Sequence, residues 1–244
     1  MYRRDFEGSH PLGRDRFADI VERYGLKVRQ KVRRPRITDS THGLPVFPNL
    51  IKDYIPLAPD RLWVSAITYI TIWCDAEHYR FCYLSLILDA YSEEIVGWCV
   101  GRTLDARYPL KASAMALRRI DAAPGGDVSL IHHSDRGCQY AGAWYVALLK
   151  EHGIRVSMTE SGDPKDNAQA ERIDNTMKNE LLKDMVSHDI GQVRLAVSAA
   201  VKFYNEERPH MSIDMMTPME AALRTGEIAK RWVSYRAKQS KMLA

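Results

Sequence analysis

The sequence predicts an α/β fold in which helices pack on a mixed sheet. Three strand-like runs follow one another along the chain, at residues 61–73, 79–91 and 93–102. Three strands in direct succession are typical of an antiparallel meander. Helices then alternate with two further strands: a helix at 108–120, a strand at 127–135, a helix at 141–153, a strand at 154–159 and a long helix at about 166–185. This order indicates one mixed five-stranded sheet with helices against its faces.

The residues before the sheet predict a short helix and an extended linker. Apolar side chains recur at i, i+3, i+4 and i+7 from Phe17 to Tyr24, and Gly25 suits a C-terminal cap. Residues 27–36 follow with six cations and no acid. Residues 37–60 contain four prolines and little periodicity, as an extended linker does.

The later elements carry local signals of their own. The run "LWVSAITYI" at 62–70 is uncharged and mixes aromatic, β-branched and small residues, which predicts a buried strand. A helix is expected at about 190–207. Thr217 and Glu220 have the spacing of a capping box, and a proline lies at the first helical position between them, so another helix begins there.

Size and composition fit a globular protein. The chain has 244 residues, enough for one large domain or one domain with a small appendage. Its net charge of +4 is only a weak sign of a polyanionic partner. The four cysteines form no metal-binding or paired pattern, which favours reduced thiols in the cytoplasm. No stretch approaches the ~20 apolar residues of a membrane span, and no leader is evident.

Two acidic residues are candidates for chemistry. Asp135 ends a predicted strand, and Glu171 lies on the long helix with Lys178 seven positions later on the same face. Carboxylates at a strand end and on a helix can converge at the edge of an α/β sheet, and Mg²⁺ prefers such oxygen ligands. Two such ions, about 3.5–4 Å apart, support phosphodiester chemistry. The alternatives are a turn aspartate and a solvated helix face.

Five blocks resemble a known family in order and spacing: "LWVSAITYI", "LILDAYSEEIVGW", "IHHSDRGCQY", "DNAQAERIDNTMKNE" and "FYNEERPHMSIDMMTPMEA". They are similar to bacterial insertion-sequence transposases of the OrfB type, whose catalytic core is the ribonuclease H-like core of retroviral integrases. The resemblance covers roughly residues 10–225. It implies a polynucleotidyl transferase with an Asp, Asp, Glu triad that uses Mg²⁺ or Mn²⁺ to cleave element ends and join them to target DNA. It also implies a helical, basic DNA-binding segment at 1–36, a linker at 37–60, a catalytic core at 61–207 and a helical tail at 208–244.

Only two of the family's three acidic residues have counterparts in this sequence. The family separates its last two acids by 35 residues, as Asp135 and Glu171 are separated here, and Lys178 matches a basic residue of the family. The family's first aspartate corresponds to Ala66. A methyl group cannot bind a metal ion, so the resemblance implies an inactive protein in which Asp135 and Glu171 bind the metal weakly. A deliberate Asp→Ala change and natural decay of the element both remain open as causes.

One acid is a candidate substitute for the missing ligand. Asp89 ends the second predicted strand, and a hairpin centred near residues 77 and 78 would set position 66 roughly opposite it. The alternative is that Asp89 belongs to the family's own "LD" block and has no metal role. His132 and His133 are adjacent on a strand, so their side chains point to opposite faces and are not expected to share one ion.

Double-stranded DNA is the expected partner. The cations of the basic run are expected to neutralise phosphates, with a steep salt dependence, and Lys178 to position a phosphate near the active site; the run comprises Lys27, Arg29, Lys31, Arg33, Arg34 and Arg36. Arg14 and Arg16 are further candidates. A solvated basic linker without a fixed partner is the alternative.

The resemblance further implies a homo-oligomer, an upstream partner frame in some elements, and a bacterial cytoplasmic, nucleoid-associated location without membrane contact. Two other functions stay open. One is a non-catalytic DNA-binding regulator derived from a transposase. The other is a ribonuclease H-like nuclease that cleaves without joining.

Overall fold

The structure is a computed structural model that describes residues 13–24, 35, 42–75, 78–121, 129–160 and 167–231. Its centre is a five-stranded sheet in the order β3-β2-β1-β4-β5. The strands are β1 (Leu62–Trp73), β2 (Tyr79–Asp89), β3 (Ile95–Gly101), β4 (Ile131–Ser134) and β5 (Arg155–Met158).

The sheet is mixed, as predicted. β1, β2 and β3 form an antiparallel meander, whereas β4 runs parallel to β1, and β5 runs parallel to β4. The uncharged run at 62–70 therefore lies in the central strand of the sheet.

The helices described are α1 (Arg14–Arg23), α2 (Arg107–Asp121), α3 (Cys138–Ala141), α4 (Ala143–Glu151), α5 (Ala168–Thr176), α6 (Ile190–Glu206) and α7 (Pro218–Ala221). The helix expected at 141–153 is preceded by the short α3, because extended backbone at Gly142 (φ −63°, ψ 141°) separates the two. The long helix expected at 166–185 is shorter: α5 passes into a π-helical turn, η2 (Met177–Leu181). A 3₁₀ turn, η3 (Met211–Ile213), precedes α7, which has the predicted capping box.

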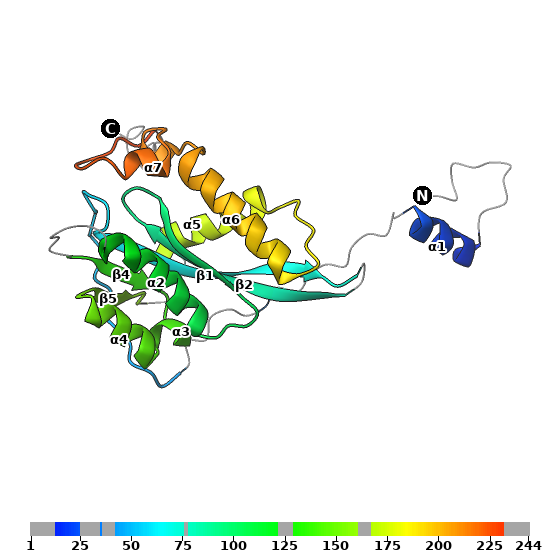
Figure 1. Ribbon diagram of the computed structural model, residues 1–244, viewed down its shortest axis with the longest axis horizontal. Helices are drawn as coiled ribbons and strands as arrows, with labels where there is room; N and C mark the ends of the chain where they lie inside the picture. Colours follow the sequence, from blue (N-terminus) through cyan, green and yellow to red (C-terminus); the bar gives the residue numbers. More distant parts are fainter. Residues whose placement is uncertain are drawn as a thin grey trace, which may run out of the picture.

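Two apolar cores lie on opposite faces of the sheet (Figure 1). Successive side chains of β1 alternate between them. Val64 packs in a core with side chains of α5 and α6, whereas Trp63 packs in a core with side chains of α2, α3 and α4. Burying one such large apolar side chain contributes about 1.5–3 kcal/mol, so this alternation fixes which face of β1 each residue occupies.

The N-terminal helix has no comparable core. α1 forms where it was predicted, but none of its residues is buried. Gly25 and the six cations of the basic run lie outside the described residues, so their predicted roles stay predictions. In the part of the chain that the structure describes, no helix is long and apolar enough to cross a bilayer. The four cysteines are free thiols.

Candidate active site

The three positions of the predicted triad lie on neighbouring elements: Ala66 on β1, Asp135 directly after β4, and Glu171 on α5. Val64 on β1 pairs with His133 on β4, and the strands run parallel. Ala66 lies two residues after Val64, and Asp135 lies two residues after His133, directly after the end of β4. Ala66 packs against the core that contains Ala170, and α5, which also carries Glu171, packs on β1.

Local hydrogen bonds hold these elements in place. The Asp135 carboxylate accepts a hydrogen bond from the backbone N–H of Gly137 at 3.0 Å, which orders the turn after β4. Asn167, the residue before α5, donates from its side-chain amide to the carbonyl oxygen of Ser65 at 3.1 Å. The start of α5 is therefore tied to β1 one residue before Ala66.

The site contains a third carboxylate that sequence reasoning missed. Burial raises the pKa of Asp174 to about 8; Lys178 lowers this pKa, and Asp135 and Glu171 raise it. The residue is half-buried, but its Oδ1 is buried and has no hydrogen-bond partner among the described residues. The available signal was spacing, since Asp174 lies three positions after Glu171 and so near the same helix face.

A buried phenol shares this electrostatic environment. Burial raises the pKa of Tyr140 well above its usual value, and Tyr145, Asp135 and Asp174 raise it further. The hydroxyl of Tyr140 also has no hydrogen-bond partner among the described residues. Asp135 and Asp174 thus influence a common buried region beside the strand.

Lys178 lies on the π-helical turn that follows α5. Its Nζ is 3.6 Å from the centre of the Tyr69 ring, a cation–π contact. Tyr69 lies on β1 three residues after Ala66, and Lys178 also lowers the pKa of Asp174. The predicted basic residue is therefore held close to the acidic side chains.

The two adjacent histidines are engaged elsewhere. The Nε2 of His132 lies 2.6 Å from Ser65 Oγ and 2.9 Å from Tyr145 OH, and the Nδ1 of His133 lies 2.9 Å from Ser157 Oγ. Burial lowers the pKa of His132 to about 3. The side chains pack locally, as predicted. Within the described ranges, no three His, Cys, Asp or Glu side chains surround a point that one ion could occupy.

The register expected for Asp89 was wrong, and the structure favours the alternative that Asp89 has no metal role. β1 and β2 pair Ala66 with Leu86 and Asp89 with Trp63. The Asp89 carboxylate is buried, and its oxygens already accept several hydrogen bonds. It accepts hydrogen bonds from the backbone N–H groups of Asp60, Tyr91 and Ser92 and from the Ser92 hydroxyl. Asp89 therefore stabilises the β2–β3 turn and is not paired with position 66.

The block "FYNEERPH" docks the end of α6 on the sheet. The side-chain amide of Asn205 accepts a hydrogen bond from the backbone N–H of Ile95 and donates one to its carbonyl, each at 3.0 Å. The rings of Tyr204 and His210 meet edge to face with centres 4.6 Å apart. These contacts give the block a structural role at the end of α6.

Known proteins resemble this chain in sequence and in fold. Two models described as integrase core domain match residues 56–164 and 152–218. The insertion element IS600 31 kDa protein of Shigella sonnei is 34% identical over 209 residues, 85% of this chain and 74% of that protein. A putative transposase for IS986/IS6110 of Mycobacterium tuberculosis is 33% identical over 206 residues, 82% of this chain and 72% of that protein.

Transposase InsF for IS3A of Escherichia coli is 29% identical over 213 residues, 86% of this chain and 70% of that protein. A simian T-cell lymphotropic virus intasome in complex with a PP2A regulatory subunit contains a similar chain, with a TM-score of 0.57 at 15% identity over 82% of this chain and 67% of that one. This likeness and the mixed five-stranded sheet confirm the ribonuclease H-like fold. The chain belongs to the insertion-sequence transposases with an integrase core domain.

Proposed function

We propose that this chain is a transposase of the Asp-Asp-Glu polynucleotidyl transferase type whose catalytic activity is lost because Ala66 occupies the position of the first aspartate. The observation that supports the proposal is the β1–β4 register, which pairs Val64 with His133; its continuation by two residues would set position 66 beside Asp135. A carboxylate at position 66 would face the same point as Asp135 and Glu171, and the present methyl group offers no ligand there.

Asp135 and Glu171 are the residues that would hold Mg²⁺ or Mn²⁺. Their carboxylate oxygens suit a hard cation, and the buried Oδ1 of Asp174, which has no hydrogen-bond partner among the described residues, supports a polar ligand in this region. Two metal ions held there would supply activation of the attacking oxygen and stabilisation of the leaving oxygen of a phosphodiester. With two acids in place of three, the site should bind metal weakly.

The protein's own residues orient the DNA. Lys178, held near Asp174 and Tyr69, is positioned to neutralise a phosphate at the site. Arg14 and Arg16 are exposed on α1 and could contact the backbone of the duplex. The cations of residues 27–36 would add to this contact, so residues 1–36 act as the DNA-binding segment, joined by 37–60 to the core and its C-terminal tail.

The partners in this proposal are element ends, target DNA and further copies of the chain. Transposition joins two ends to one target, which requires at least two active sites held together. The similar simian viral chain is part of an intasome, and we expect an assembly of several copies on DNA here as well.

A DNA-binding regulator is the second candidate, and Ala66 itself favours it. A protein that holds element ends without cutting them would compete with active transposase. The same experiment separates the two functions.

The test is restoration of the carboxylate by Ala66→Asp, assayed as nicking and strand transfer on DNA that carries the ends of the encoding element. With Mg²⁺ or Mn²⁺, we expect product formation at least ~10³-fold faster than in the parent chain, since a catalytic metal supplies several kcal/mol. Ala66→Asn is the matched control, of equal size but without the charge, and should stay inactive. Specific binding without cleavage by Ala66→Asp, under either metal, would favour the regulator. Cleavage without joining would indicate a nuclease.

A further inference from the structure

A cavity of about 570 Å³ adjoins the candidate active site. Five parts of the chain enclose it: the segment at 51–57, the start of β1, the β2–β3 turn, the start of α5, and residues 226–230 with η3. This volume is typical of pockets that bind small organic molecules. None of the roles assigned above uses the cavity.

The cavity and the active site share two structural elements. Val64, which lines the cavity, precedes Ala66 by two residues on the same face of β1, a distance of ~6.6 Å along a strand. Asn167 also lines it and precedes Glu171 by four residues, ~6 Å along a helix. A DNA strand with one phosphate at the acidic residues can therefore reach the cavity with a neighbouring nucleotide.

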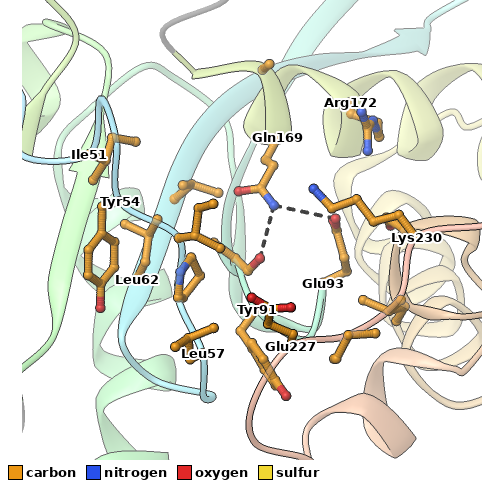
Figure 2. Close-up of a pocket in the computed structure, with 18 of the residues that line it drawn as sticks. Ile51, Tyr54, Leu57, Leu62, Tyr91, Glu93, Gln169, Arg172, Glu227 and Lys230 are labelled. Carbon is orange, nitrogen blue, oxygen red and sulfur yellow. Dashed lines mark hydrogen bonds between the residues drawn. The ribbon is translucent and has the colours of Figure 1, made fainter. Parts of the chain in front are cut away.

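One wall of the cavity is apolar. Ile51, Tyr54, Leu57 and Leu62 lie together on one side, and Glu93, Arg172 and Lys230 lie on the other (Figure 2). Tyr54 and Leu57 belong to the segment before β1, and Leu62 is the first residue of that strand. A flat aromatic group can pack against such a wall and be removed from water.

The opposite wall is polar and charged. The side chains of Glu93, Gln169 and Lys230 point toward one another, with Arg172 nearby (Figure 2). The Gln169 amide donates hydrogen bonds to the carbonyl of Ala90 at 3.0 Å and to the Glu93 carboxylate at 3.5 Å. Glu93 is buried, with left-handed backbone at φ 61°, and interacts electrostatically with Arg172 and Lys230.

The charges of the lining are balanced. The lining contains two acids, Glu93 and Glu227, and two cations, Arg172 and Lys230. A simple anion would be repelled by the acids. A ligand that combines a phosphate with N–H donors on a flat ring fits this lining. Its phosphate can pair with the cations, its N–H groups can donate to the acids, and its ring can pack on the apolar wall.

We propose that this cavity receives one unstacked nucleotide of the DNA strand that passes through the active site. Its base lies against Tyr54 and Leu57 and donates N–H groups to Glu93, while Arg172 and Lys230 contact its phosphate. This inference rests on the proposed function, because it requires that the chain bind element ends. It goes beyond that function by assigning a separate site to a nucleotide next to the reacting phosphate. Removing a base from the stack would free the adjacent phosphate to enter the narrow space beside β1.

The experiment uses the full chain with its native Ala66, so that the DNA stays intact. Duplexes with the sequence of the element end carry 2-aminopurine at one position at a time on either side of the expected cleavage point. 2-Aminopurine fluoresces more strongly when it leaves the stack. We expect a severalfold rise at a single position when the protein binds.

Two variants locate the unstacked base. Leu57 is 52% exposed, so Leu57→Trp should fold and fill the cavity, and the fluorescence rise should disappear even at protein concentrations that saturate the DNA. Arg172→Gln should reduce the rise by weakening the phosphate contact. Leu223→Trp, at an 87% exposed position outside the cavity, is the matched control and should leave the rise unchanged.

The possible failures are distinguishable. Specific binding without a fluorescence rise at any position overturns the nucleotide site and leaves the proposed function standing. A rise that survives in Leu57→Trp shows that the base is held elsewhere and also overturns the proposal. Absence of binding to element ends overturns the proposed function and this inference with it.

Discussion

Replacement of Asp174 by asparagine should stabilise the protein at alkaline pH. Burial raises the pKa of Asp174 from 3.8 to about 8, although Lys178 works in the opposite direction. One pKa unit corresponds to about 1.36 kcal/mol, so the full shift of roughly four units would cost at most about 5–6 kcal/mol. Because the residue keeps partial exposure, we expect a gain of ~2–3 kcal/mol for the neutral variant.

The pH dependence has a definite sign. The native protein keeps the Asp174 proton up to about pH 8, whereas the unfolded chain loses it near pH 4. The native state binds more protons in this window, so its stability falls as pH rises from about 4 to 8. Asparagine does not titrate. The stabilising effect of Asp174→Asn should therefore be small at pH 4 and largest above pH 8.

Urea unfolding at pH 4.5 and pH 8.5, in EDTA to exclude divalent ions, measures the effect. Asp184→Asn is the matched control, since Asp184 is exposed, and it should change stability little at either pH. An equal free-energy difference between the parent and Asp174→Asn at the two pH values would refute the reasoning. It would mean that the carboxyl is hydrated like that of an ordinary surface aspartate.

Three further predictions concern other contacts. Asn205→Ala removes both hydrogen bonds to the backbone of Ile95 and should lower the free energy of unfolding by ~2–4 kcal/mol. Urea titration measures this change, and unchanged stability would exclude a docking role for Asn205. Lys178→Ala should weaken binding to all DNA sequences alike and reduce the slope of log K against log salt by ~1, and a loss confined to one sequence would contradict the phosphate role. Asp89→Asn should lower the free energy of unfolding by ~1–3 kcal/mol, because it weakens the hydrogen bonds of the β2–β3 turn. When Asp89→Asn is added to the Ala66→Asp protein, DNA cleavage should stay intact. Loss of cleavage in this folded double variant would indicate that Asp89 acts in the active site.

The sheet was predictable because each strand left a strong local signal. Long uncharged or apolar runs separated by turns predicted the antiparallel meander of β1, β2 and β3. The alternation of strands and helices after them indicated β4 and β5. The pairing register of β1 and β2 was harder to predict from the sequence than the strands themselves. The position of a hairpin turn fixes every cross-strand pair, and an error of one to two residues in its centre moved the expected partner of Ala66 from Leu86 to Asp89.

The candidate site was accessible only where the family pattern names a residue. Asp135 and Glu171 were proposed from their spacing and stay predictions, and spacing alone does not tell which neighbouring polar residue turns inward. Asp174 lies among other polar positions on the same helix, and only packing shows that its Oδ1 is buried. The π-helical turn at η2 was also missed, because a single wide turn leaves no distinct residue pattern in a helical stretch.

The missing metal ligand is the central claim, and Mn²⁺ binding tests it most directly. Titration of Mn²⁺ into the parent chain and into Ala66→Asp, followed by electron paramagnetic resonance of the free ion, compares the two sites without DNA or turnover. We expect Ala66→Asp to bind Mn²⁺ at least ~10-fold more tightly, since one added carboxylate ligand contributes more than 1.4 kcal/mol. Asp135→Asn in the restored protein should abolish the gain. Equal affinity of the parent chain and Ala66→Asp would contradict the account.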